Sequence, residues 1–109
     1  MATEKNTLPG NTTMLVLKLL GEEDMYGYQI IDEIAKKSND VFHLKTGTLY
    51  PLLHGLEKGG MVTSYDQAAD NQRVRKYYSI TPAGRGALVQ KQAEWEMYSK
   101  AVKRVMAYA

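Results

Sequence analysis

The sequence contains no cysteine, which excludes disulfide bonds and metal sites built from thiolates. It also lacks any apolar run long enough to cross a bilayer, and its opening residues, MATEKNTLPG, do not show the basic and then apolar segments of a signal peptide. These absences lead us to expect a soluble protein of the cytoplasm that has no membrane partner.

Motifs of catalysis and metal binding are missing as well. The two histidines, His43 and His54, have no third ligand at a suitable spacing. We find no nucleophile beside a base, no glycine-rich phosphate loop between a strand and a helix, and no pair of carboxylates in a predicted cleft. The sequence therefore predicts a protein that is not an enzyme and that has no metal or cofactor.

Basic side chains gather toward the second half of this chain of 109 residues, which is long enough for one domain with a modest core. Residues 1–42 hold four basic and seven acidic side chains, residues 43–81 five and three, and residues 82–109 five and two. A nucleic acid could use this asymmetry, because phosphate neutralisation supplies most sequence-independent binding. On charge alone an ordinary solvated surface remains the simpler explanation, so the motifs must decide.

Apolar spacing predicts three helices in the first part of the chain. The run TTMLVLKLL, residues 12–20, is apolar at nearly every position, which indicates a helix buried on more than one side. A second amphipathic helix follows in MYGYQIIDEIAKKS, with its isoleucines on one face. A third runs from Thr46 to Lys58 and ends at Gly59-Gly60.

The third helix carries two different faces. Its leucines recur at the i, i+3, i+4, i+7 spacing of one buried stripe: Leu49, Leu52, Leu53 and Leu56. We expect the hydroxyl of Thr46 or Thr48 to cap the helix, with Pro51 in the opening turn, where its missing N–H costs little. The outward face near the helix start then holds Thr46, Thr48, Tyr50, Pro51 and His54.

The pattern next changes to that of a β-hairpin. MVTSY and RKYYSIT are rich in β-branched and aromatic residues, and the polar segment DQAADNQRV between them predicts a long tip. The motif TPAG then offers a threonine cap and Pro82 at the first position of a last helix.

The last helix carries an apolar stripe with steps of three and four residues, typical of a seam with a partner helix. Its apolar members are Leu88, Trp95, Tyr98, Val102 and Val105, with Lys91 as the polar member of the series between Leu88 and Trp95. We expect this stripe to dimerise the protein.

The order helix, helix, helix, hairpin, helix predicts a winged helix-turn-helix, a mainly α fold with a small β-hairpin and one C-terminal dimerisation helix. Residues 1–81 would form the DNA-binding domain with its N-terminal helix, and residues 82–109 the dimerisation helix of the same compact unit. The start of the third helix would enter the major groove, and the wing would contact the phosphate backbone or minor groove. The expected DNA-binding residues are Thr46, Gly47, Thr48, Tyr50, Pro51 and His54 on the helix and Arg73, Arg75 and Lys76 on the wing.

Three segments carry a family resemblance in matching order: MYGYQI, TGTLYPLLHGLEKGGMV and RKYYSITPAGRGAL. They resemble the motifs of the PadR family of bacterial transcriptional regulators, over most of Met14 to Leu88. The resemblance to the short subfamily implies a winged domain that binds operator DNA and a C-terminal helix that dimerises. It also implies phosphate contacts for Tyr28 and Tyr50, and it matches the paired tyrosines Tyr77 and Tyr78, of which we expect Tyr77 to face DNA. The chain departs from the family at Tyr26, where many members have histidine, and in its wing sequence NQRVRKYY.

Trp95, the only tryptophan, permits two interpretations. Spacing alone favours a packing role in the dimer interface. The chain is also similar to the multidrug-sensing PadR-like regulators, and this similarity implies a tryptophan pair that sandwiches a planar aromatic effector in a central pore. Large stacking area and attraction for cations suit tryptophan to that role. Such a pore would be lined by Met14, Leu17, Gln92, Trp95 and Ser99.

We therefore expect a homodimeric transcriptional repressor that a ligand or stress signal releases from double-stranded operator DNA. The signal would act by changing the distance between the two recognition helices. The alternative is a winged-helix module that binds a small molecule or a protein and has no specific DNA binding. The sequence does not provide the operator, the regulated genes or the effector.

Overall fold

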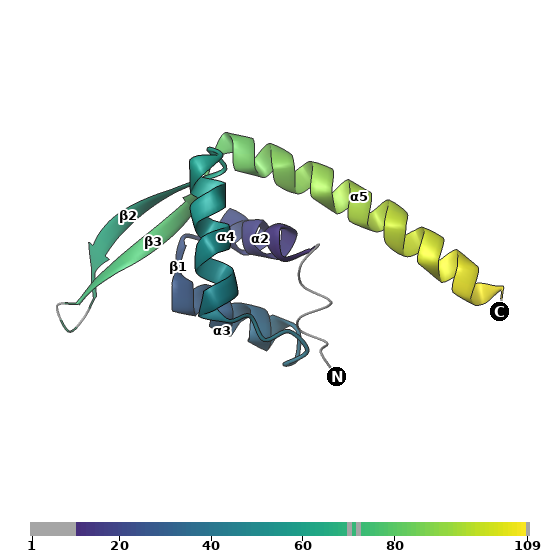
Figure 1. The fold of residues 1–109 in the computed structure, drawn as a ribbon, viewed down its shortest axis with the longest axis horizontal. Coiled ribbons are helices and arrows are strands. Elements are labelled where there is room, and N and C mark those ends of the chain that lie inside the picture. The colour runs from purple at the N-terminus through teal and green to yellow at the C-terminus, as the bar shows by residue number, and fades with distance from the viewer. Residues whose placement is uncertain (1–10, 70, 72, 109) are drawn as a thin grey trace.

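The computed structural model describes residues 11–69, 71 and 73–108. Along them lie α2 (Thr12–Glu22), β1 (Met25–Tyr26), α3 (Gly27–Lys37), α4 (Thr46–Lys58), β2 (Val62–Ala68), β3 (Val74–Ile80) and α5 (Pro82–Ala107). Figure 1 shows α2, α3 and α4 gathered into one body, with the β2–β3 hairpin projecting on one side and α5 on the other. This is the predicted order, a helix-turn-helix followed by a wing and a long terminal helix.

Helix α2 forms the centre of the core, as its apolar sequence predicts. Val16, Leu17, Leu19 and Leu20 are each at most 4% exposed. The helix contacts α3, β3 and α5, so it is buried on more than one side, and Lys18 and Glu22 mark the side that faces solvent. Burying a leucine in this way stabilises the fold by about 1.5–3 kcal/mol relative to leaving it exposed.

The leucine stripe of α4 packs inward as predicted, whereas the predicted cap of this helix is wrong. Leu49 and Leu53 are fully buried, and Leu56 nearly so. The N-cap residue is Lys45, which makes no side-chain cap bond, and Thr46 is already the first helical residue. Pro51 therefore lies in the second turn, where its missing N–H cannot bond the carbonyl of Gly47.

Helix α4 ends in a glycine turn, as predicted. Gly60 has a φ of 78°, a left-handed conformation that favours glycine. Its N–H donates to the carbonyl of Glu57 at 3.1 Å, and the N–H of Met61 donates to that of Leu56 at 2.9 Å. This pair of bonds is a Schellman motif, which turns the chain directly into β2.

The described residues hold a three-stranded antiparallel sheet in the order β1-β3-β2. The hairpin pairs Val62 with Ile80 at its base and Ala68 with Val74 near its tip. Strand β2 is therefore longer, and the tip of the hairpin shorter, than the sequence predicts, while β3 has the predicted length and begins one residue earlier. Strand β1, which pairs Met25 with Tyr78, is an element that the sequence analysis misses.

Helix α5 begins at the predicted cap. The Oγ1 of Thr81 accepts a hydrogen bond from the N–H of Gly84 at 3.1 Å, and Pro82 occupies the first helical position. The first turns pack against α2, while the remainder extends away from the body, opposite to the wing (Figure 1). Even α5, with its 26 residues, is not apolar enough to cross a membrane, and neither is any other helix among the described residues.

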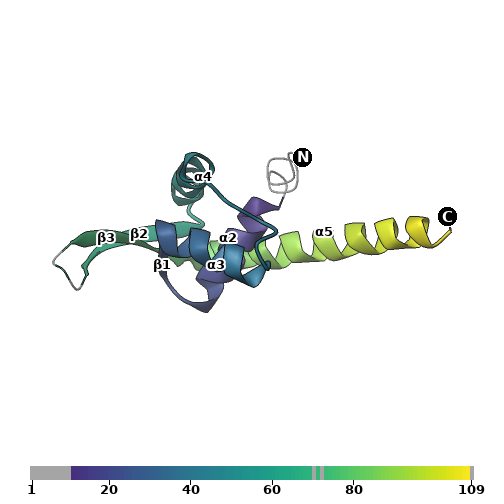
Figure 2. The same ribbon diagram turned by 90° about the horizontal axis from the view of Figure 1, so that it is seen from below.

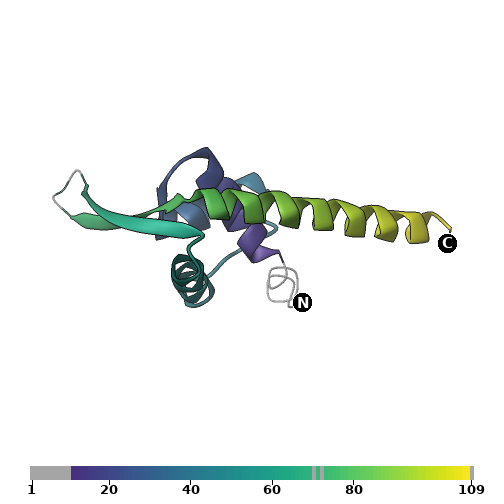
Figure 3. The same cartoon turned by 90° about the horizontal axis from the view of Figure 1, so that it is seen from above.

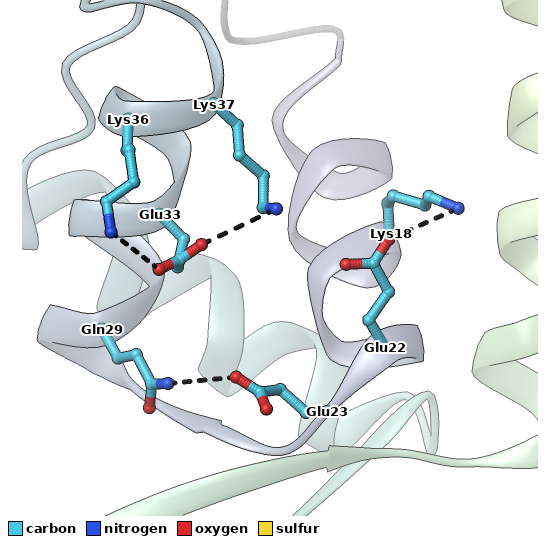
Figure 4. Close-up of polar contacts among 7 residues, drawn as sticks. All are labelled: Lys18, Glu22, Glu23, Gln29, Glu33, Lys36 and Lys37. Carbon is cyan, nitrogen blue, oxygen red and sulfur yellow. Dashed lines mark hydrogen bonds and ion pairs between the residues drawn. The ribbon is translucent and has the colours of Figure 1, made fainter.

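Polar contacts hold the turn between α2 and α3 (Figure 4). The Nε2 of Gln29 donates to the carboxylate of Glu23 at 3.4 Å, which joins the start of α3 to the end of α2. Glu33 of α3 pairs with both Lys36 and Lys37 one turn further along the same helix. These exposed ion pairs are 3.7–3.8 Å long, and such pairs contribute about 0–1 kcal/mol each.

Candidate nucleic-acid interface

A cleft of about 540 Å³ lies where the start of α3, the first half of α4 and strand β3 meet. Five of its residues were predicted from the sequence to contact DNA: Tyr28, Tyr50, Arg73, Arg75 and Lys76. The lining also includes Tyr26, Gly27 and Val74, which the sequence analysis did not assign. The fold thus brings the start of α3, the second turn of α4 and three basic side chains to one place.

Tyr50 crosses from α4 onto the first residue of α3. A Cβ built on Gly27 would overlap the hydroxyl of Tyr50 and lie 2.9 Å from its Cε1. Only a glycine leaves room for this ring, which explains the glycine of the MYGY motif. Partial burial, and the neighbouring phenols of Tyr78 and Tyr28, raise the pKa of Tyr50. Its hydroxyl therefore stays protonated and can donate to an anionic oxygen.

Both helices that contribute residues to the cleft lack a side-chain cap. The N-cap residues, Tyr26 for α3 and Lys45 for α4, accept no hydrogen bond from their helices with their side chains. First-turn N–H groups have no intrahelical partner and favour negative charge. A phosphate oxygen is a suitable acceptor for groups of this kind.

The described residues leave the cations of the wing without an ion-pair partner. Within the described residues, no carboxylate lies within 4.0 Å of Arg73, Arg75 or Lys76, since the ion pairs found involve other lysines. Arg73 and Lys76 are exposed. Arg75 is half-buried as a residue, and its guanidinium Cζ lies 4.3 Å from the centroid of the Tyr26 ring. These side chains give the wing side of the cleft a positive charge.

The outer face of α4 continues from the cleft. Figures 2 and 3, viewed from opposite sides, both show α4 standing out from the layer that contains the hairpin and α5. Its predicted contact residues are all exposed: Thr46, Gly47, Thr48, Pro51 and His54. Nothing in the described part of the chain covers this face, so a duplex could approach it together with the wing.

Tyr77 lies elsewhere than predicted. It is half-buried between Tyr26, at 5.4 Å between ring centroids, and Tyr65, at 5.8 Å. It is not among the described residues that line the cleft. Its position fits a packing role between these two rings.

A second groove, of about 140 Å³, lies between α2 and α5 beside Trp95. Its lining residues are Met14, Leu15, Lys18, Gln92, Trp95 and Glu96. Met14, Gln92 and Trp95 thus lie together as predicted, with Ser99 one turn further, its hydroxyl donating to the carbonyl of Glu96 at 3.3 Å. The prediction for Leu17 is wrong, because this side chain is fully buried in the core, and the partly buried Leu15 lines the groove instead.

The stripe of α5 divides into two parts. Leu88 is 9% exposed and belongs to the core cluster, so its prediction as a dimerisation residue is wrong: the first turns of α5 cover α2. The later members are open, with Tyr98 64% and Val105 70% exposed and Trp95 and Val102 each 41%. This apolar surface has no cover among the described residues.

Comparison with known proteins identifies the family. The model of the PadR-like transcriptional regulator family matches residues 16–90. The chain belongs to this family. It is therefore a DNA-binding transcriptional regulator with a winged helix-turn-helix fold, the fold class and function predicted from the sequence.

Individual relatives support this assignment. The Mycobacterium tuberculosis protein named Transcriptional regulator Rv3488 is 31% identical over 87 residues, 80% of this chain and 78% of its own. A protein of Lysinibacillus sphaericus named Uncharacterized protein X is 36% identical over 86 residues, 79% of each chain.

Solved structures of regulators resemble this chain over nearly its whole length. A transcriptional regulator from Clostridium thermocellum, Cth-833, superposes with a TM-score of 0.83 at 35% identity, over 91% of this chain and 96% of its own. The PadR-like transcriptional regulator BC4206 from Bacillus cereus gives 0.80 at 27% identity, over 91% and 94%. The PadR fold thus extends through the wing and into α5.

Proposed function

We propose that this regulator binds double-stranded operator DNA through the cleft and the outer face of α4. The observation that carries the proposal is the meeting of Tyr28, Tyr50 and the three wing cations in one cleft beside α3 and α4, two helices that lack a side-chain cap. Thr46, Thr48 and His54 then face base edges in the major groove, while Arg73, Arg75 and Lys76 contact phosphates.

The functional unit is a homodimer that pairs along α5. The uncovered stripe of Trp95, Tyr98, Val102 and Val105 supports this, because a helix with an apolar face needs a partner. A dimer with two-fold symmetry presents two α4 helices to half-sites about 34 Å apart, or a multiple of that distance. A small change in the angle between protomers would then prevent both helices from docking at once.

The protein acts as a repressor that an effector releases. The groove between α2 and α5 supports an effector site, because Trp95 contributes a stacking surface there and Met14 an adaptable apolar wall. A planar aromatic compound suits such a lining. Binding would alter how α5 sits on α2, and hence the spacing of the α4 helices.

A titration at two salt concentrations tests DNA binding. Labelled DNA from the region upstream of the protein's own gene is titrated with protein, and fluorescence anisotropy is measured against an unrelated duplex of equal length. We expect tight binding to the upstream DNA, with a logarithmic salt slope of about −0.9 for each phosphate neutralised. Equal and weak binding to both duplexes, in the presence of candidate corepressors as well, would favour the alternative of a winged-helix module without specific DNA binding.

The effector site has a separate test. A planar aromatic dye is added while Trp95 fluorescence is recorded, and the same dye is then added to the protein–DNA complex. Quenching together with release of the DNA supports an effector-controlled repressor. Quenching without release, in a protein that does not discriminate between duplexes, supports the small-molecule module.

A further inference from the structure

Three tyrosine rings form a continuous row across the outer face of the sheet. The strand register sets Tyr77 of β3 opposite Tyr26 of β1 on one side and opposite Tyr65 of β2 on the other. Tyr26 and Tyr77 meet edge to face at 5.4 Å, while Tyr65 and Tyr77 stack at 5.8 Å with an interplanar angle of 14°. We call these residues the tyrosine row. Each of the three strands contributes one ring to it.

The far end of the tyrosine row is anchored. The hydroxyl of Tyr65 donates to the carboxylate of Asp24 at 2.7 Å, and Asp24 directly precedes β1. Strand β1 has only two residues, Met25 and Tyr26, so backbone pairing alone gives it little support. The ring contacts and the Asp24 bond therefore help to fix Tyr26 against the sheet.

The near end of the tyrosine row carries Arg75. This residue lies two positions before Tyr77 on the same face of β3, and its guanidinium Cζ is 4.3 Å from the centroid of the Tyr26 ring, a cation–π contact. Arg73 and Lys76 have no such platform among the described residues and are more exposed. Arg75 is thus the one of the three wing cations with a ring beneath it.

This contact places a positive charge where the wing meets the helices. Tyr26 directly precedes Gly27, the residue that Tyr50 covers, and all of these residues line the same cleft. A guanidinium that is already ordered loses less rotamer freedom on contacting a phosphate. Avoiding that loss improves affinity by about two- to tenfold for one side chain.

We infer that Tyr26 is a positioning residue, which with the tyrosine row holds the Arg75 guanidinium at the cleft, ready for a phosphate of the operator. The inference rests on the proposed function, because Arg75 must contact DNA for its placement to affect affinity. It assigns unlike roles to the wing cations: Arg75 is a fixed contact, and Arg73 and Lys76 are adaptable ones.

Four variants test this role in the full-length protein, each titrated onto the upstream DNA over a range of salt concentrations. Tyr26→Leu should weaken binding by about two- to tenfold per wing with an unchanged salt slope. Arg75 still contacts its phosphate in this variant, but its side chain is not ordered before DNA binds. Arg75→Ala should lower both affinity and salt slope, the slope by about 0.9 per wing. Tyr26→Phe, which keeps the ring, should bind like the wild type. Tyr26→Leu combined with Arg75→Ala should bind like Arg75→Ala alone.

Two results would overturn the inference: wild-type affinity for Tyr26→Leu, or a further loss when that change is added to Arg75→Ala. A further loss of affinity together with a changed salt slope would indicate that Tyr26 only stabilises the structure of the wing. Unspecific binding by the wild-type protein would instead count against the proposed function.

A measurement without DNA or mutation tests the same point. NMR relaxation of the side-chain Nε–H groups in the free wild-type protein should give a clearly higher order parameter for Arg75 than for Arg73. Equal mobility of the two groups would contradict the inference, even if Tyr26→Leu failed to fold or DNA binding failed.

Discussion

Tyr50 lies against Gly27 so closely that a Cβ on this glycine would overlap the tyrosine hydroxyl. The contact joins the first residue of α3 to the second turn of α4, and it sets the ring at the cleft that the wing also borders. The placement of the Tyr50 hydroxyl therefore depends on a missing side chain in another helix.

Gly27→Ala is expected to weaken DNA binding more than it weakens the fold. The obstructing atoms are the outer end of a ring that is 39% exposed, so the ring can swing away at small cost while its hydroxyl leaves the cleft. Anisotropy titration should give an affinity close to that of Tyr50→Ala, with the urea midpoint nearly unchanged.

The matched control for this change is Gly55→Ala on α4. A Cβ at Gly55 meets nothing within 4 Å, and alanine in an exposed helix interior is favoured by about 0.8–1.0 kcal/mol over glycine. We expect a small gain in stability and unchanged affinity. If Gly27→Ala still lowered affinity in a Tyr50→Ala background, the two residues would not act through their contact.

Gly84 and Gly86 provide a comparison of stability within one helix. A Cβ on Gly84 would overlap the carbonyl oxygen of Met61 and lie 2.8 Å from the Cγ1 of Ile80, whereas one on Gly86 meets nothing within 4 Å. The carbonyl cannot move freely, because it accepts a hydrogen bond from the N–H of Thr81 at 3.0 Å.

Gly84→Ala should therefore destabilise the protein by about 1–3 kcal/mol, the usual cost of overpacking. Gly86→Ala should stabilise it by about 0.5–1 kcal/mol, because alanine is the better residue in a helix interior. Urea unfolding followed by circular dichroism measures both. Equal effects of the two changes would mean that α5 does not approach Met61 as the structure has it.

Features carried by local spacing could be predicted from the sequence. The leucines of α4, the glycine turn at its end and the Thr81 cap each depend on residues a few positions apart. The motifs that resemble the PadR family lie in the same segments, and the match of the family model to residues 16–90 confirms the resemblance.

Features that depend on distant contacts could not be predicted. Strand β1 is too short for a periodic signal and exists only because Met25 and Tyr26 pair with β3. Leu88 and Trp95 belong to one apolar stripe, yet Leu88 is buried in the core and Trp95 is 41% exposed beside α2. Spacing alone does not show where along α5 the burial ends. Gly27 and Tyr50 likewise give no sign in the sequence that they touch.

The hydrogen bond from Tyr65 to Asp24 gives a prediction about pH. This bond is the main cause of the raised pKa of the Tyr65 hydroxyl, followed by partial burial. Because the folded-state pKa lies above the unfolded value, the stabilisation is present below the ordinary pKa of tyrosine and is lost as the pH rises through the raised value.

Asp24→Asn should lower the pKa of Tyr65 toward its ordinary value of 10.0. A pH titration of protein labelled with carbon-13 at tyrosine Cζ resolves the individual hydroxyls. Tyr50 serves as the internal control, since its raised pKa comes from burial and from other tyrosines. An unchanged pKa of Tyr65 in the variant would contradict the bond.

The proposed dimer predicts unlike effects from two similar changes on α5. Val102 belongs to the uncovered stripe, whereas Met97, 73% exposed, lies about 200° around the helix from Trp95, since 3.6 residues make one turn. Val102→Lys would introduce a charge into the apolar seam of two copies. Met97→Lys would add the same charge to a face that we expect to remain in water.

Sedimentation velocity at several protein concentrations should show dimers for the wild type and Met97→Lys, and monomers for Val102→Lys. The midpoint of thermal unfolding should rise with concentration only in the first two, because association stabilises the folded state by mass action. The reverse result, with Met97→Lys dissociating and Val102→Lys remaining a dimer, would move the interface to the opposite face of α5. The effector groove at Trp95 would then lie outside the interface, so a ligand there could not change the spacing of the two α4 helices in the way we propose.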